Sequence, residues 1–200
     1  MVHGYHLIFG TYGTWLPNDP RGSWSEFVAS WELFWFGRSP RRDENTSMLT
    51  HPTLRESRTV RQRSLKYHPV QFNGKQALAV GNGFASAVRR HQWSVWACSI
   101  LPEHVHLVLA RWKSSAEQAV VFFKAEASTE LKKQGLHPAY LCDRSVWERG
   151  KWISFLDSET AIEDAIHYVE DNPVKEGKPK QKWSFVTPFA GLEKGWMTYH

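Results

Sequence analysis

The amino-acid sequence predicts an α+β protein that folds as a single domain. Short runs of aromatic and β-branched residues alternate along the chain with longer segments of helical periodicity. Of the 200 residues, 42% are hydrophobic and 14% are aromatic, which is enough to build a substantial core. One domain is therefore expected over residues 1–200, with a basic insertion at about residues 25–75.

The N-terminal half begins with a strand, expected over residues 5–12, and a loop rich in proline and glycine over residues 13–22. Residues from about 25 to 75 show no sustained period, so they form the insertion. The apolar residues of segment 74–90 recur at three-to-four spacing and predict a helix. Two glycines near the centre of this segment weaken that prediction.

The C-terminal half supplies two further strands, a helix, a fourth strand or hairpin, and a last helix. Their expected bounds are 93–100 and 104–110 for the paired strands, 114–134 for the helix, 146–155 for the fourth strand or hairpin, and 158–171 for the last helix, which Pro173 should stop. The order of the elements is that of the split βαβ, ferredoxin-like pattern. We therefore expect an antiparallel sheet with helices on one face and an additional C-terminal helix.

The charge of the chain suits a polyanionic partner. The formal net charge is +5 and the sequence pI is about 9.2. The segment from Arg38 to Lys66 carries eight Lys or Arg against three Asp or Glu, which alone gives a net charge of +5. No apolar run approaches the length of about 18 residues that crosses a bilayer. We therefore expect a cytoplasmic protein that does not associate with membranes.

Two histidines share one face of the predicted strand 104–110. Alternate side chains of a strand point the same way, so His104 and His106 lie opposite the apolar set Val105, Leu107 and Leu109. Both imidazoles could bind one divalent cation. In a chain with ten histidines, two histidines separated by one residue often occur by chance. The alternative interpretation is therefore that His104 and His106 bind no metal.

Tyr168 and Asn172 share one face of the last predicted helix, because residues four apart differ by only about 40° of rotation. Asp164 lies one turn earlier, and Ile162 and Val169 belong to the apolar side that would dock on a sheet. We expect the polar faces of helix and strand to oppose their apolar sides and to meet in a solvent-open pocket. The alternative for Tyr168 is a half-buried packing residue.

These fragments resemble a known family. The segments 102–109 (PEHVHLVL) and 168–177 (YVEDNPVKEG) are similar to the paired signature of the single-tyrosine HUH transposases, particularly the REP-associated tyrosine transposase branch. The opening 5–24 (YHLIFGTYGTWLPNDPRGSW) also resembles starts in that branch. The likeness covers residues 1–24 and about 93–175.

The resemblance implies an enzyme that nicks and joins single-stranded, hairpin-forming DNA through a 5′-phosphotyrosine. It implies Tyr168 as the nucleophile, and His104, His106 and Asn172 as ligands of Mg²⁺ or Mn²⁺. A phenol, with an ordinary pKa near 10, needs such activation at neutral pH. Glu103 stands where relatives have Asn, and could serve as an extra ligand or as a cap of the turn.

The expected partner is single-stranded or hairpin DNA, and a homodimer is left open. Candidate DNA contacts are basic and aromatic side chains of the N-terminal loop and the insertion: Arg21, Trp24, Arg38, Arg41, Arg42, Arg61 and Arg63. Two alternatives to the enzyme remain. One is a catalytically inactive relative that binds hairpin DNA or RNA, and the other is a structural domain that needs no metal.

Overall fold

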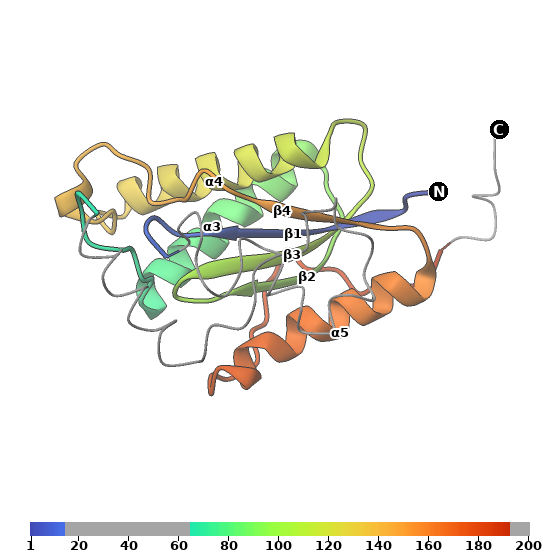
Figure 1. The fold of residues 1–200 in the computed structure, drawn as a ribbon. Helices are drawn as coiled ribbons and strands as arrows, with labels where there is room; N and C mark the ends of the chain where they lie inside the picture. The colour runs from blue at the N-terminus through green and yellow to red at the C-terminus, as the bar shows by residue number, and fades with distance from the viewer. Residues whose placement is uncertain (15–64, 193–200) are drawn as a thin grey trace, which may run out of the picture.

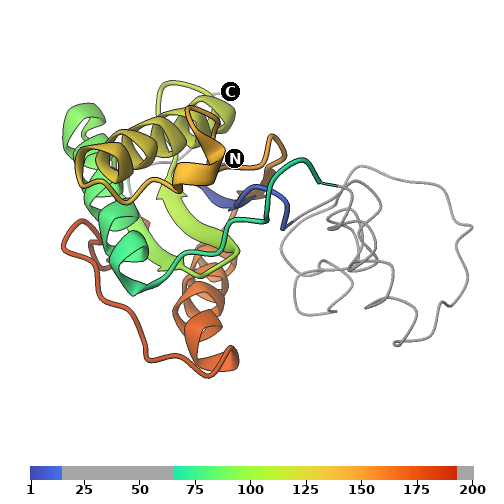
Figure 2. The same ribbon diagram turned by 90° about the vertical axis from the view of Figure 1, so that its left-hand side faces the viewer.

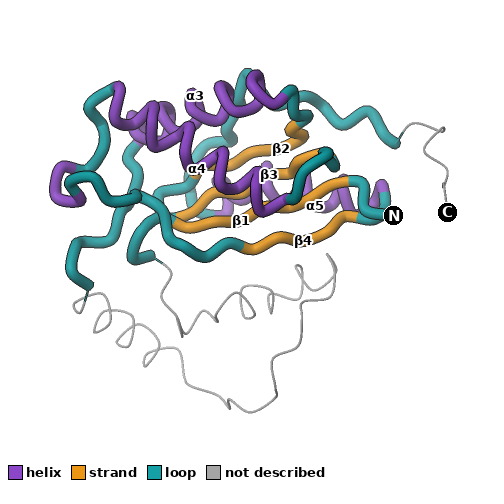
Figure 3. Tube along the Cα trace, turned by 90° about the horizontal axis from the view of Figure 1, so that it is seen from above, coloured by secondary structure: helices purple, strands orange, loops and turns teal. Residues whose placement is uncertain are grey.

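The computed structural model describes residues 1–14 and 65–192. Within them the chain forms one antiparallel sheet with the strand order β2-β3-β1-β4 (Figures 1 and 3). The strands are β1 (Gly4–Gly10), β2 (Val95–Ile100), β3 (His104–Ala110) and β4 (Trp152–Leu156). The helices are α3 (Gly74–His91), α4 (Ala116–Lys133) and α5 (Glu159–Lys175), with a short 3₁₀ turn η1 (Ala139–Leu141). This is the expected split βαβ topology with an additional C-terminal helix.

Each helix begins at a residue whose side chain caps it. Asn73 and Gln76 form a reciprocal capping box at the start of α3, and Ser115 accepts a hydrogen bond from the backbone N–H of Gln118 in α4. Ser158 does the same for Ala161 in α5. These caps satisfy backbone donors that helix geometry leaves unpaired, which explains why the predicted starts lie within about two residues of the observed ones.

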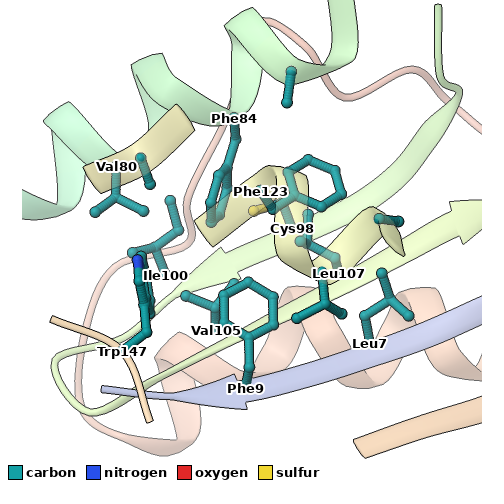
Figure 4. Close-up of a cluster of buried hydrophobic side chains, with 14 of the residues drawn as sticks. Leu7, Phe9, Val80, Phe84, Cys98, Ile100, Val105, Leu107, Phe123 and Trp147 are labelled. Carbon is teal, nitrogen blue, oxygen red and sulfur yellow. The ribbon is translucent and has the colours of Figure 1, made fainter. Parts of the chain in front are cut away.

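The helices cover both faces of the sheet. Helices α3 and α4 pack on one face and α5 packs on the other, as Figures 1 and 2 show. The larger core lies beneath α3 and α4, where Leu7, Phe9, Val105 and Leu107 point toward the helices (Figure 4). The smaller core lies beneath α5. Its buried members are Ala97, Val108, Leu156, Ile162, Ala165 and Val169.

The strand alternation expected for residues 104–110 is present. Val105, Leu107 and Leu109 belong to the core beneath α3 and α4, whereas Val108 belongs to the core beneath α5. The two central strands, β1 and β3, are buried along their lengths on both faces. The histidine face of β3 is therefore an interior surface under α5.

Close packing against α4 and against the C-terminal segment explains the two central glycines of α3. A Cβ atom built at Gly83 would lie 2.5 Å from Cα of Ala127 in α4, and one built at Gly81 would overlap the ring of Trp183. Glycine lowers helix propensity by about 1 kcal/mol relative to alanine. Here it permits a backbone approach that a side chain would prevent.

The C-terminal segment after α5 returns to the sheet and covers the edge strand β2. The side chain of Gln181 accepts a hydrogen bond from the backbone N–H of Ile100 and donates one to its carbonyl, both at 2.8 Å. Further along, the N–H of Thr187 donates to the carbonyl of Val95 at 2.8 Å. Helix α5 is thus connected to β4 at its start and held near β2 beyond its end.

Two expected boundaries were wrong. Strand β4 begins at Trp152, and from the preceding residues Trp147 forms only an isolated bridge with Thr11. Helix α5 continues through Pro173 to Lys175. A proline lacks only its own N–H, and the chain turns where Gly177 adopts a positive φ of 69°, with its N–H donating to the carbonyl of Val174.

Candidate active site

The site lies between the sheet and α5 and is built on β3 and β1. His104 and His106 of β3 face α5, as their alternation with the core residues requires. In the register of β1 and β3, His6 pairs with Val108, so the side chain of His6 lies on this same face. Three imidazoles therefore share the surface beneath α5.

His6 and His106 are joined directly. The Nε2 atom of His6 lies 3.1 Å from Nδ1 of His106, and both side chains are fully buried. Burial lowers the pKa of His6 to about 4. Burial, followed by the proximity of His104 and His6, holds the pKa of His106 well below its ordinary value. Burial therefore favours the neutral form of both rings.

Helix α5 places the ring of Tyr168 against this histidine pair. The ring centroid of Tyr168 lies 5.6 Å from that of His106 and 5.9 Å from that of His6, both in edge-to-face arrangements. The ammonium of Lys175, two turns later on the same helix, lies 5.0 Å from the centroid of the Tyr168 ring. The structure thus brings together a phenol, two neutral imidazoles and a positive charge.

Asn172 lies on the docked face of α5, which differs from the expectation. It is buried together with Ile162, Ala165 and Val169, whereas Asp164 is exposed. The polar groups therefore do not oppose the apolar side of the helix. They are embedded in it. The expected solvent-open pocket is wrong for the same reason, because α5 covers His106 completely and leaves His104 only 8% exposed.

His104 lies at the open end of the site. Its ring centroid is 5.0 Å from that of His106. Its Nε2 atom lies 3.9 Å from Oε1 of Glu176, just beyond α5, and the other oxygen of Glu176 accepts a hydrogen bond from Lys178 at 3.0 Å. Solvent therefore reaches the site from the side where α5 ends.

The polar atoms of this interior fit a hard divalent cation. Nε2 of His106, Nδ2 of Asn172 and Oγ of Ser99 are buried and have no hydrogen-bond partner within residues 1–14 and 65–192. Ser99 pairs with His106 across β2 and β3, so it belongs to the same face. The carboxamide of Asn172 can present its oxygen after a half-turn, and a neutral imidazole and a carboxamide are donors that Mg²⁺ or Mn²⁺ accepts.

The described residues contain no cluster of three or more His, Cys, Asp or Glu side chains arranged to hold a metal ion. The candidate set is of another composition, since it combines two histidines with a carboxamide. The carboxylate of Glu103 accepts a hydrogen bond from the side chain of Gln71 at 2.8 Å.

Sequence reasoning missed His6 and Ser99. The signal for His6 was present in residues 5–9, where Tyr5, Leu7 and Phe9 alternate as a core-facing set and leave His6 on the other face. The split βαβ order places the first and third strands side by side, which would have brought His6 next to the histidines of residues 104–106. Nothing in the sequence distinguishes Ser99 from an ordinary strand serine.

The candidate DNA contacts all lie outside the described residues. They are Arg21, Trp24, Arg38, Arg41, Arg42, Arg61 and Arg63, and they stay predictions from sequence. In the part of the chain that the structure describes, no helix is long and apolar enough to span a bilayer.

Comparison with known proteins gives structural likenesses only. No protein family model matches the chain. No curated protein matches it either. Among solved structures, it is similar to a REP-associated tyrosine transposase bound to a REP hairpin, with 14% identity, a TM-score of 0.48, and coverage of 92% of this chain and 76% of that one. It is also similar to a candidate transposase from Deinococcus radiodurans R1, with 9% identity, a TM-score of 0.39, and coverage of 90% and 94%.

Proposed function

We propose that this protein is a metal-dependent enzyme that nicks and joins single-stranded DNA through Tyr168, in the manner of the tyrosine HUH transposases. The observation that carries the proposal is the meeting of Tyr168 with His106 beneath α5, at 5.6 Å between ring centroids. Tyr168 and Asn172 come from one signature fragment, and His104 and His106 come from the other. The fold joins these fragments although about 60 residues separate them.

In the nicking step, the phenol oxygen of Tyr168 attacks the phosphorus of a DNA phosphodiester. The new bond is O–P, and the bond that breaks joins phosphorus to the 3′-oxygen, which leaves with the electron pair and takes a proton. The phenol proton passes to water. The products are a 5′-phosphotyrosine and a free 3′-hydroxyl. In the joining step a 3′-hydroxyl displaces Tyr168, and because the ester conserves the bond energy, no nucleotide cofactor is consumed.

The residues around Tyr168 have separable roles. His104, His106 and Asn172 would hold Mg²⁺ or Mn²⁺, which, when bound, withdraws charge from the phosphate oxygens. Lys175, with its ammonium 5.0 Å from the phenol ring, favours negative charge on the phenol oxygen. Tyr168 is half-buried and Glu176 beside His104 is exposed, so a phosphate can approach from this side, whereas His6 and His106 are fully buried.

The depth of the site supports a second candidate, a catalytically inactive relative that binds hairpin DNA or RNA. His6 and His106 have no exposed surface, and an enzyme must admit a phosphate to within bonding distance of Tyr168. A binding module needs no such access. The two candidates differ in one product, the covalent adduct.

The deciding experiment is a test for that adduct. The full-length protein is incubated with Mn²⁺ and hairpin-forming single strands taken from the DNA that flanks its gene, and covalent complexes are resolved on a denaturing gel. We expect an adduct with wild type and none with Tyr168→Phe. Binding of the variant should stay within about 1 kcal/mol of wild type, because only a reacting hydroxyl is removed.

Tyr140→Phe is the matched control. Tyr140 is 43% exposed, and its hydroxyl donates to the carbonyl of Pro69 at 3.4 Å, so the variant should form the adduct normally. Chelation of Mn²⁺ should abolish the adduct in both proteins. An adduct that persists in Tyr168→Phe would identify another nucleophile, and wild-type protein that binds its hairpin without any adduct would establish the binding module.

A further inference from the structure

One hydrogen bond joins the buried side chains of His6 and His106, and either residue could be its donor. Both rings are fully buried, and a charged imidazole is costly in such surroundings, so each ring carries one N–H and one lone pair. At 3.1 Å, Nδ1 of His106 and Nε2 of His6 must therefore share a single proton between them. Either His106 donates and His6 accepts, or the reverse.

The direction decides whether His106 can bind a cation. When His106 donates from Nδ1, its Nε2 atom keeps a free lone pair. When His6 donates instead, Nε2 of His106 is protonated and cannot be a ligand. Among the described residues, Nε2 of His106 lies buried without a hydrogen-bond partner on the face that it shares with Ser99, and Nδ1 of His6 is likewise buried without one.

We propose that His6 is a positioning residue whose Nε2 atom accepts a hydrogen bond from Nδ1–H of His106, and so fixes His106 in the tautomer that presents Nε2 to a divalent cation. This inference rests on the metal site of the proposed function. It assigns a role to a residue of β1 that lies in the opening segment 5–24 and outside the paired signature fragments.

The packing around His6 holds its ring in place beside His106, with Nε2 of His6 facing Nδ1 of His106. Its ring centroid lies 5.3 Å from that of His106, and Tyr168 contacts it from the helix side at 5.9 Å. Ligand imidazoles in metal sites generally donate their second nitrogen to a fixed acceptor, and loss of that acceptor typically weakens metal binding by about 10- to 100-fold. In this protein the acceptor is a third histidine.

The hydrogen bond can be observed directly in the full-length protein. With histidines labelled with ¹⁵N, NMR spectra recorded in Mg²⁺ should show His106 protonated at Nδ1 only, and a ¹⁵N–¹⁵N coupling between Nδ1 of His106 and Nε2 of His6. A merely structural packing role for His6 would not require this coupling. Its absence, or a proton on Nε2 of His106, overturns the assignment.

Three variants then connect the hydrogen bond to metal affinity, measured by electron paramagnetic resonance of Mn²⁺. His6→Phe keeps a planar ring but has no acceptor, and it should bind Mn²⁺ about 10- to 100-fold more weakly. His6→Gln places a carboxamide oxygen near the position of Nε2 and should bind within about threefold of wild type. His68→Phe is the control, since His68 is exposed and contacts the ring of Tyr140 instead.

The outcomes separate the two proposals. Wild-type protein that binds Mn²⁺ no more tightly than His6→Phe overturns the role of His6 and leaves the enzyme untouched. Wild-type protein that binds no Mn²⁺ overturns the metal-dependent function itself. Should His6→Phe fail to fold, two other measurements decide: the ¹⁵N–¹⁵N coupling in the wild type and the Mn²⁺ affinity of His6→Gln. The proposal is contradicted if the wild type lacks the coupling and His6→Gln binds Mn²⁺ much more weakly than the wild type.

Discussion

Single polar atoms inside an apolar layer distinguish this site from ordinary packing. Beneath α5, Val108, Ile162 and Val169 form a small core, yet the same layer contains His106, Asn172 and Ser99 with buried polar atoms that have no hydrogen-bond partner. An unpaired buried polar group costs about 1–3 kcal/mol. A chain selected only for stability would have apolar side chains at these positions.

Asn172→Leu should therefore raise stability and lower metal affinity together. The substitution removes a buried amide nitrogen that has no partner among the described residues and keeps the branched shape of the side chain, so the free energy of unfolding should rise by about 1 kcal/mol in chelator. Mn²⁺ affinity should fall at least about tenfold. Urea unfolding and metal titration measure the two effects.

Asn82→Leu is the control for Asn172→Leu, because Asn82 is exposed on α3 and its replacement should change stability by less than about 0.5 kcal/mol. A loss of stability in Asn172→Leu beyond about 1 kcal/mol would mean that the amide makes a stabilising contact, contrary to the structure.

At the level of residues, the sequence predicted that Tyr168 and the histidines of residues 104–106 come together, but it predicted the orientation of their helix less well. The alternation of residues 104–110 correctly separated the core face from the histidine face, because a strand has only two faces. The helix offers a continuous range of directions, so the four-residue spacing of Tyr168 and Asn172 could not show that Asn172 docks with Val169. Which side of a helix meets a sheet depends on the tertiary fit, and local spacing does not determine it.

Among the elements, α3 and α4 show a case where local propensity and tertiary packing conflict. Gly81 and Gly83 weaken the helix signal, and yet α3 is continuous from Gly74 to His91. Glycine is required at position 83 because α3 and α4 cross closely there, with Gly83 against Ala127. Intrinsic propensity is a weak term that packing over a whole helix outweighs.

Gly83→Ala tests this crossing. The added methyl group would meet the Ala127 backbone at 2.5–2.7 Å, where no flexible side chain can yield, so the variant should lose about 1–3 kcal/mol or more of unfolding free energy. Gly74→Ala, at the start of the same helix, has no atom within 4 Å of the new methyl group and should be neutral or slightly stabilising. Thermal unfolding of both variants checks the contrast, and equal effects would contradict the close approach.

Element boundaries failed where a local rule was applied too strongly. Pro173 disfavours helical angles at the preceding residue, but α5 is docked on the sheet through Ile162 and Val169 and continues to Lys175. The extension keeps Lys175 on the helical face that bears Tyr168.

At the scale of the whole molecule, charge is distributed unevenly along the chain. The segment from Arg38 to Lys66 contains all of the formal net charge of +5, and most of it lies outside the described residues. Arginines that contact phosphates add affinity with little choice of sequence. We expect this segment to strengthen DNA binding generally.

Replacement of Arg38, Arg41, Arg42, Arg61 and Arg63 by Gln should reduce the salt dependence of single-stranded DNA binding. Each arginine that neutralises a phosphate contributes about 0.7 to the slope of log affinity against log salt. The control is Lys132→Gln with Lys133→Gln, two exposed lysines at the end of α4, on the sheet face opposite α5. If the slope of log affinity against log salt is unchanged in the arginine variant, these arginines do not contact phosphates.

The return of the chain from α5 to β2 fixes how far the helix can travel. Strand β4 leads into α5, and beyond the helix the paired hydrogen bonds of Gln181 with Ile100 fasten the chain to the opposite edge of the sheet. Movement of α5 away from the histidines would therefore require these hydrogen bonds to break. If Tyr168 becomes joined to DNA while they remain intact, the attached strand end stays above the histidines, and the other DNA strand end has to move to reach it.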